Sequence, residues 1–278
     1  METTISKGQT SVPCFAATSG RPESSLRKRI MARNLSGEFV QRSEDRLYPS
    51  LANPNFLVLQ ARRVIFTRWI KELSPSRGLT VLDVGGRYQP YRPLFENRLA
   101  RYIACDLART ELVDVIASGE SLPFPSHSFD VVLCTQVFEY FDHPHQAAKE
   151  IHRVLRPGGV LLMSVVSFGP RFVDDEHWRY TPSGIQAVLN PFGQIAIVPE
   201  TSSIGGLLRA TNLALHAFAH FGPLRRMYEL TVCPLINLIG LGFEGLRMSG
   251  NDQFTPNYSV LATKQAKEPT GPGVKDQS

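Results

Sequence analysis

The chain has 278 residues, 42% of them hydrophobic, and a net charge of +5, which fits a globular protein with a sizeable core and excludes a disordered or fibrous chain. Residues 1–72 carry 12 basic and 6 acidic side chains, so the positive charge is concentrated at the N-terminal end. These charges could meet anionic lipid or phosphate, although a solvated flank is the simpler explanation. No aromatic residues interleave with them as in a nucleic-acid-binding surface, so we expect no nucleic-acid partner.

The cysteines and the N-terminus indicate the compartment. Four cysteines lie far apart, without a C-x-x-C pair: Cys14, Cys105, Cys134 and Cys233. Cys105 and Cys134 fall in apolar runs of strand length, where a reduced thiol behaves as a small hydrophobic side chain. Polar residues also interrupt the N-terminal stretch before the apolar region of a secretory signal could form. We therefore expect a cytoplasmic protein.

Composition divides the chain into a folded domain and two flexible ends. Residues 1–45 form a basic segment without sustained periodicity, and 264–278 have the composition of a disordered, solvated tail. The folded domain is expected over 46–263. It begins with a predicted helix over 56–73, in which apolar side chains recur among basic ones and would pack one stripe against the rest of the domain.

Seven apolar runs of strand length come after that helix. They lie at residues 80–84, 102–105, 113–117, 131–134, 160–166, 194–198 and 258–263. Helical pattern lies between most of them, and Pro144 and Pro157-Gly158-Gly159 bound a helix between the fourth and fifth runs. Strand alternating with helix predicts an α/β fold with a doubly wound, mostly parallel, seven-stranded sheet.

A helical insertion is predicted at 204–250, between the sixth and seventh strands. It holds two apolar stretches, 204–221 and 227–246, and each is interrupted by polar or charged residues. Neither stretch therefore has the run of about 20 apolar residues that a transmembrane helix needs. Two explanations stay open. The helices cap the sheet or the active site, or they lie on a membrane surface through 204–246, with the protein peripheral at the inner face of the membrane.

The turn after the first strand points to a cofactor. Residues 81–91 read V-L-D-V-G-G-R-Y-Q-P-Y, and without a Cβ atom Gly85 and Gly86 let backbone N–H groups approach a nucleoside closely. Asp106 ends the second strand, where a carboxylate can accept hydrogen bonds from both ribose hydroxyls, or can cap the residues after it. The spaced glycines of G-x-G-x-x-G are missing, which disfavours a nicotinamide cofactor.

Six motifs occur in order within residues 56–263: V-L-D-V-G-G, Y-I-A-C-D, G-E-S-L-P-F-P, S-F-D-V-V-L-C, H-R-V-L-R-P-G-G and W-R-Y-T-P. Together they resemble the class I S-adenosylmethionine-dependent methyltransferases, in the group often called methyltransferase type 11. The resemblance implies a Rossmann-like methyltransferase fold and S-adenosyl-L-methionine as the cofactor. It also implies methyl transfer to a small-molecule, glycan or lipid-linked acceptor.

The resemblance further implies the residues of the site. Those expected at the cofactor are Asp83, Gly85, Gly86, Arg87, Asp106, Leu107, Ser118, Gly119, Glu120, Thr135 and Gln136. Two of them depart from the family's pattern. Arg87 replaces a third glycine and could pair with the cofactor's carboxylate or point to solvent, and Ser118 replaces an acid and would accept a weaker hydrogen bond from adenine. We therefore expect modest cofactor affinity.

Methyl transfer from a sulfonium needs the acceptor to be positioned and water to be excluded. A hydroxyl acceptor also benefits from a general base. The candidates for this base are Glu139, Tyr140, His143, Asp175 and His177. Acceptor-binding candidates are Phe138, Trp178, Arg179 and Tyr180, although packing beneath a helix explains Trp178 equally well. No histidine group forms a ligand set, so we expect no metal. The alternative function is a noncatalytic binding or membrane-docking protein with an eroded cofactor pocket.

Overall fold

The computed structural model describes residues 43–73, 78–170, 176–219, 222–245 and 252–266. All of them belong to one compact unit of the chain, residues 36–278. The segments expected to be flexible, 1–45 and 264–278, lie largely outside the described residues.

The unit is built on a seven-stranded sheet in the order β3-β2-β1-β4-β5-β7-β6. The strands are β1 (Leu79–Val84), β2 (Leu99–Asp106), β3 (Val115–Ile116), β4 (Phe129–Thr135), β5 (Leu155–Val166), β6 (Gln194–Pro199) and β7 (Asn257–Thr263). The pairs among β1 to β5 are parallel, and β7 runs antiparallel to β5 and β6. The predicted doubly wound, mostly parallel sheet is confirmed. Its carboxyl edge, at the ends of β1, β2 and β4, is where ligands bind in such sheets.

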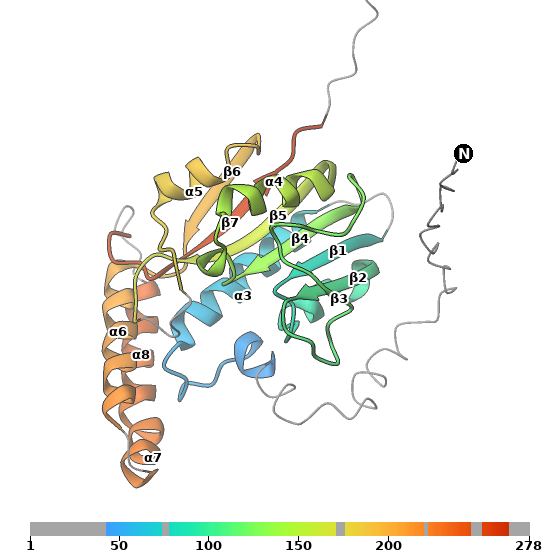
Figure 1. Ribbon diagram of the computed structural model, residues 1–278. Helices are drawn as coiled ribbons and strands as arrows, with labels where there is room; N and C mark the ends of the chain where they lie inside the picture. Colours follow the sequence, from blue (N-terminus) through green and yellow to red (C-terminus); the bar gives the residue numbers. More distant parts are fainter. Residues whose placement is uncertain (1–42, 74–77, 171–175, 220–221, 246–251, 267–278) are drawn as a thin grey trace, which may run out of the picture. The chain divides into compact units, whose positions relative to one another are not determined.

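Helices cover both faces of the sheet (Figure 1). On one face lie α3 (Phe56–Glu72) and the 3-10 helix η1 (Arg92–Arg98), and on the other α4 (Pro144–Val154) and α5 (Pro182–Val188). α4 begins at Pro144 as predicted, because proline suits the first turn of a helix. Several strand ends differ from the prediction by a few residues, and β5 differs most. It starts at Leu155 and not at residue 160, because Leu155 pairs with Phe129 of β4, and Gly158 and Gly159 bond to the backbone of Lys264 directly after β7.

Three helices form the insertion between β6 and β7: α6 (Ser203–Phe218), α7 (Gly222–Leu230) and α8 (Val232–Gly245). Figure 1 shows α6 and α8 side by side, with α7 at the far end of the pair. α6 starts at the N-cap Ser202, whose Oγ accepts the N–H of Gly205 at 3.2 Å. A Cβ atom on Gly206 would lie 1.9 Å from the carbonyl oxygen of Phe254, so glycine lets α6 pack directly on the segment before β7.

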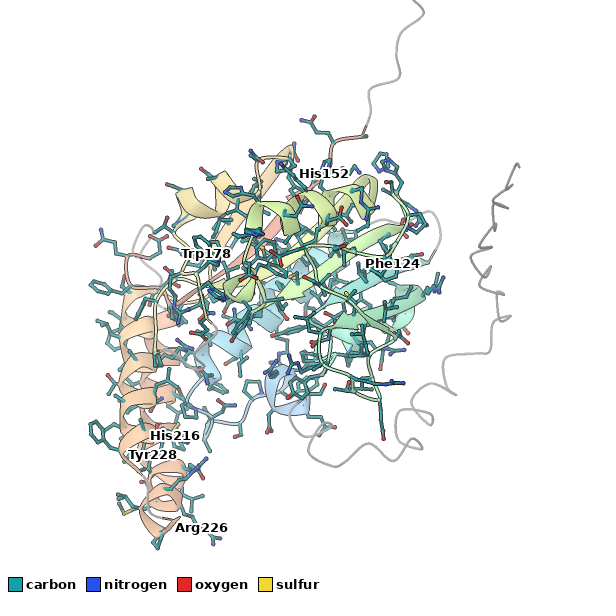
Figure 2. The ribbon with its side chains drawn as sticks, in the orientation of Figure 1. Phe124, His152, Trp178, His216, Arg226 and Tyr228 are labelled. Atoms are coloured by element: carbon teal, nitrogen blue, oxygen red, sulfur yellow. The ribbon has the colours of Figure 1, made fainter. Side chains whose placement is uncertain are left out.

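The insertion buries polar groups and exposes apolar ones. Asn212 donates from Nδ2 to Oδ1 of Asn237 at 3.0 Å, and the hydroxyl of Tyr228 donates to the carbonyl of Asn212 at 2.8 Å. The three helices are called the arm below, and Figure 2 shows Tyr228 on this arm and Arg226 near its end. Twelve large apolar side chains of the three helices are exposed: Ile204, Leu207, Leu215, Phe218, Leu224, Met227, Leu230, Val232, Leu235, Leu238, Ile239 and Phe243. Within the described part of the chain, no helix has the length and apolarity needed to cross a membrane.

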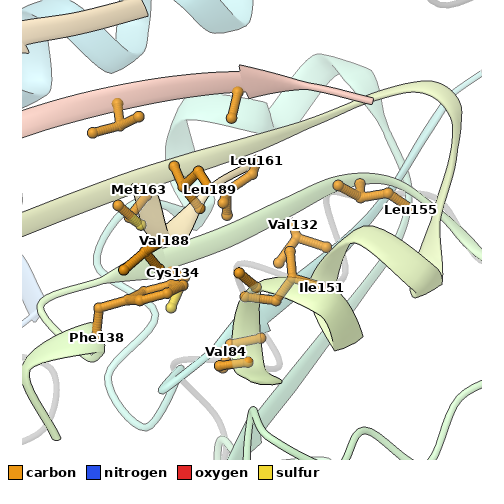
Figure 3. Packing of buried hydrophobic residues seen from close by; sticks show 14 of the residues in the cluster. Val84, Val132, Cys134, Phe138, Ile151, Leu155, Leu161, Met163, Val188 and Leu189 are labelled. Atoms are coloured by element: carbon orange, nitrogen blue, oxygen red, sulfur yellow. The ribbon is translucent and has the colours of Figure 1, made fainter. Parts of the chain in front are cut away.

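The larger core lies between the sheet and α4 and α5 (Figure 3). Because side chains alternate along a strand, Val132 and Met163 face these helices, whereas Leu133 faces α3. Ile151 of α4 is fully buried against this side of the sheet, and burial of such a side chain contributes about 1.5–3 kcal/mol. A second core lies between the sheet and α3. The two cores together hold the carboxyl ends of the strands in place.

Candidate functional site

The turn after β1 depends on glycine for close packing. Gly85 has a φ of +77°, and a Cβ atom there would lie 2.3 Å from Cγ2 of Val137. The N–H groups of Gly85 and Gly86 both donate to the carbonyl of Cys105, at 2.8 and 3.1 Å. This corrects the expectation that these N–H groups are free to approach a cofactor. The glycines instead offer a surface without side chains at the carboxyl edge.

Asp83 is buried beside this turn on the face that α3 covers. The hydroxyl of Tyr102 donates to its Oδ2 at 2.6 Å. Burial raises the pKa of Asp83 to about 7, and the nearby charge of Asp106 acts in the same direction. A Cβ atom on Gly86 would lie 2.8 Å from Cγ of Asp83, so the carboxyl group packs directly against the backbone of the turn.

Asp106, at the end of β2, holds the position expected of the ribose acid. Its Oδ1 accepts the N–H of Ala108 at 2.8 Å, and its Oδ2 accepts from Nε of Arg87 at 3.2 Å. Arg87 therefore adopts an arrangement that neither sequence alternative anticipated, with 44% of its side chain exposed. A carboxylate has about four acceptor sites, so two sites remain for the two hydroxyls of a ribose. The neighbouring Leu107 is 73% exposed and presents an apolar surface beside this acid.

The segment expected to frame the adenine is fixed by its own turn and by the chain after β4. Oγ of Ser118 accepts the N–H of Glu120 at 3.2 Å, and Oε1 of Glu120 accepts the N–H of His143 at 2.5 Å. A Cβ atom on Gly119 would lie 2.6 Å from Cζ of Phe141, which explains the glycine by packing alone. The hydroxyl of Ser118 is thus already used as an acceptor, although it has a second lone pair.

Thr135 ends β4, and Gln136 comes next with a φ of +57°. Positive φ is uncommon outside glycine and clusters at functional sites, where surrounding contacts must enforce it. Here the N–H of Gln136 donates to the carbonyl of Ser164 at 2.8 Å, and Nε2 donates to Oγ of Ser164 at 3.1 Å. Oε1 of Gln136 accepts from Nδ2 of Asn257 at 3.1 Å. Both polar atoms of the Gln136 amide, which is expected near the sulfonium, are therefore held by hydrogen bonds.

A buried network that the sequence analysis missed supports Gln136. Ser164 and Ser259, paired across β5 and β7, donate from Oγ to Oε1 of Glu200 at 2.7 and 2.8 Å. Arg62 of α3 binds both oxygens of Glu200, at 2.7 and 2.9 Å. Burial alone would lower the pKa of Arg62, but Glu200 raises it above its ordinary value. Glu200 directly follows β6, so the rule that identified Asp106, a carboxylate after a strand, was the available signal.

The candidate bases that the structure describes differ in burial. Glu139 is buried, its Oε1 accepts the N–H of Val166, and its Oε2 has no hydrogen-bond partner among the described residues. Burial raises its pKa to about 7. The other described candidates lie at the surface: Tyr140, whose hydroxyl is 3.3 Å from Glu176, His143, and His177, which is 3.7 Å from Asp142. Asp175 lies outside the described residues.

Two of the four acceptor-binding candidates are core residues. Phe138 is fully buried and packs edge to face with Phe141 and Tyr180, whose hydroxyl donates to the carbonyl of Phe138 at 2.9 Å. Phe138 and Tyr180 are thus unavailable to an acceptor, which corrects that expectation. Trp178 is half exposed and donates from Nε1 to the carbonyl of Phe141 at 2.7 Å (Figure 2), and Arg179 pairs with Glu176. Across the described segments, no three His, Cys, Asp or Glu side chains are grouped to hold a metal ion.

The sequence is similar to known methyltransferases. Residues 82–163 match the family model described as a methyltransferase domain. An uncharacterized methyltransferase of Mycobacterium tuberculosis is 31% identical over 223 residues, covering 71% of this chain and 85% of that protein. One of Mycolicibacterium gilvum is 30% identical over 221 residues, covering 70% and 84%. A solved structure of Haemonchus contortus phosphoethanolamine N-methyltransferase 2 with S-adenosyl-L-methionine aligns with a TM-score of 0.48 and 14% identity, covering 82% of this chain and 60% of that one.

Proposed function

The chain belongs to the class I S-adenosylmethionine-dependent methyltransferases, and from that premise we propose that it methylates a small-molecule, sugar or lipid-linked acceptor. The observation that carries the site assignment is Asp106, a buried carboxylate at the carboxyl edge with acceptor capacity left for a ribose diol. Membership of an enzyme family favours catalysis over the noncatalytic alternative.

The residues around Asp106 fit S-adenosyl-L-methionine, which supplies a methyl group on a sulfonium that is already activated for displacement. In this proposal Asp106 binds the ribose hydroxyls, and the exposed Leu107 covers the adenine together with the segment 118–120. The bare turn at Gly85 and Gly86, supported by Asp83, accommodates the methionine end. The negative charge of Asp106 also favours a cationic cofactor.

For the acceptor, the chain's contribution is positioning. Gln136 is locked in a left-handed conformation by Ser164 and Asn257, so its backbone carbonyl and side chain keep one orientation at the end of β4. Such preorganisation avoids an entropy cost when the acceptor is aligned with the sulfonium. Glu139 is better explained as a positioning residue than as a base, because it is buried and holds the N–H of Val166 at the end of β5.

Substitution of Asp106 tests the cofactor site. We expect Asp106→Ala to weaken S-adenosylmethionine binding by about 1–3 kcal/mol, because the charge-assisted hydrogen bonds to ribose are lost. Isothermal titration calorimetry measures this, and Asp106→Asn, which keeps the shape and one acceptor oxygen, should lose less. Equal affinity of Asp106→Ala and the wild-type protein would refute the ribose assignment. A methyl-transfer screen over glycan, lipid and small-molecule acceptors then identifies the acceptor.

A second proposal concerns 204–246, and it is favoured by the exposed apolar surface of α6, α7 and α8. We propose that this arm lies on an anionic membrane surface. Its outward apolar side chains would enter the interface, and Arg226, exposed and without an ion-pair partner among the described residues, would face the lipid headgroups. Contact with a membrane would bring the site close to lipid-linked acceptors.

A further inference from the structure

Arg209 of α6 is a buried arginine that the mechanism above does not use. Only 5% of the residue is exposed, and its Nε donates to Oδ1 of Asn55 at 3.0 Å. In the part of the chain that the structure describes, its two terminal nitrogens have no hydrogen-bond or ion-pair partner. A guanidinium carries five N–H donors, so most of its hydrogen-bonding capacity is unused.

Among the residues that the structure describes, the charges around Arg209 do not balance. Glu200 attracts Arg209 electrostatically, but both oxygens of Glu200 are bound to Arg62, so no ion pair with Arg209 forms. Two buried arginines thus share one carboxylate. Glu139 is close enough to act on Arg62, yet it is not among the groups that act on Arg209. Burial lowers the pKa of Arg209 to about 10, which still leaves it charged at neutral pH.

The position of Arg209 relates it to the methyl acceptor. Three segments meet there: Asn55 before α3, Gly169 after β5, and Arg209 itself. A Cβ atom on Gly169 would lie 3.5 Å from Nη1 of Arg209, so the glycine leaves that nitrogen uncovered. The same region contains the network that runs from Glu200 through Ser164 to Gln136. Because Glu200 acts on Arg209 electrostatically, Arg209 is near the network that fixes Gln136, the residue proposed to position the acceptor.

We propose that Arg209 binds an anionic group, a carboxylate or a phosphate, of the methyl acceptor. This inference rests on the proposed methyl transfer and narrows its substrate class. A buried charge without a partner costs free energy, and an incoming oxyanion offsets that cost while the planar guanidinium binds two of its oxygens. A neutral acceptor would not offset the cost of burying the Arg209 guanidinium, so Arg209 favours an anionic acceptor over a neutral one.

Thermal unfolding with inorganic phosphate or malonate, against chloride at equal ionic strength, tests the proposal on the full chain. We expect one oxyanion to raise the Tm of the wild-type protein by several degrees, and the probe that succeeds distinguishes phosphate from carboxylate. Arg209→Met should abolish this shift, whereas Arg226→Met, which removes an exposed arginine of the same insertion, should keep it. Without added oxyanion, Arg209→Met should melt at or above the wild-type temperature, since an uncompensated charge is removed.

Three results would overturn the proposal: a wild-type protein that does not respond to either oxyanion, an Arg209→Met variant that responds like the wild type, or one that melts lower or fails to fold. Arg209→Lys provides a second check, because it keeps the charge and should retain a weaker response. Titration of each variant with S-adenosylhomocysteine separates the two proposals. The affinity of Arg209→Met for S-adenosylhomocysteine should lie within twofold of that of the wild-type protein. If the wild-type protein does not bind S-adenosylhomocysteine, the proposed cofactor site is wrong, whatever the oxyanion experiment shows.

Discussion

Arg87 pairs with the acid that is proposed to bind ribose, and the consequence of this pair can be measured. The pair is partly exposed, so it contributes little by itself, and Asp106 keeps acceptor sites for both hydroxyls. We expect Arg87→Ala to change cofactor affinity by less than about 1 kcal/mol, roughly fivefold. Calorimetry under the conditions used for Asp106→Ala measures it. A tenfold gain in affinity would show that Arg87 obstructs the ribose.

Glu139 gives the protein a pH dependence of stability. Its pKa is raised from 4.5 to about 7 by burial, so between these values the folded state binds more protons than the unfolded state. Stability from this group is therefore complete below about pH 4.5 and is lost as the pH rises through 7, on the order of 3 kcal/mol at most. We expect urea unfolding of the wild-type protein to show this decline.

The variant Glu139→Gln should make the decline shallower without removing it. Asp83 also has its pKa raised to about 7 by burial, so it contributes a slope of the same sign. An unchanged pH profile in Glu139→Gln would show that Glu139 titrates normally and is not buried as described.

Site residues could be predicted where one local rule suffices. The place of Asp106 at the end of β2, near a glycine turn, is confirmed, while its ribose-binding role stays a prediction. The same rule could have found Glu200, but not its partners. The roles of Arg62 and Arg209 could not be predicted, because their contacts join distant segments: Arg62 and Glu200 lie 138 residues apart, and Asn55 and Arg209 lie 154 apart. Phe138 was misassigned since sequence places it beside the site but does not say to which face its ring turns.

At the scale of elements, substitutions of two glycines test whether α6 packs directly on the segment before β7. A Cβ atom on Gly206 would meet the carbonyl of Phe254, whereas one on Gly242 would meet nothing within 4 Å. We expect Gly206→Ala to destabilise the protein by about 1–3 kcal/mol through overpacking. Gly242→Ala is the matched control and should stabilise it by up to about 1 kcal/mol, the helix propensity gain. Similar effects of both, by chemical denaturation, would mean that α6 does not pack on the segment before β7.

The elements themselves were largely predictable because their apolar periods are strong. All seven strands and the helix at Phe56–Glu72 occur where apolar spacing placed them. The insertion was predicted as helical, but not the inversion in which Asn212 and Asn237 lie inside and leucines outside. The apolar stretches left both a cap and contact with a membrane surface open, because apolar spacing alone does not say which side of a helix packs on the protein. Only the structure shows that the polar side is the one that packs.

At the scale of the whole molecule, charge and apolar exposure suggest the same partner. The chain has a net charge of +5 that is concentrated in its first 72 residues, and the insertion presents apolar side chains with Arg226 among them. Anionic lipid complements both features, since basic residues attract it and apolar ones insert between headgroups. Either feature alone would bind weakly, and together they add.

Co-sedimentation with vesicles of phosphatidylcholine and phosphatidylserine in equal parts tests this membrane contact. Phe218 is 76% exposed on α6 and Leu230 68% exposed on α7, so Phe218→Ser with Leu230→Ser should reduce the bound fraction about tenfold or more, as apolar burial is lost. Val64→Ser, at an exposed apolar position of α3, is the matched control and should bind as the wild type does. Binding should also fall as salt rises, because the electrostatic part is screened. Equal binding of the double variant and the control would place the lipid contact outside α6 and α7.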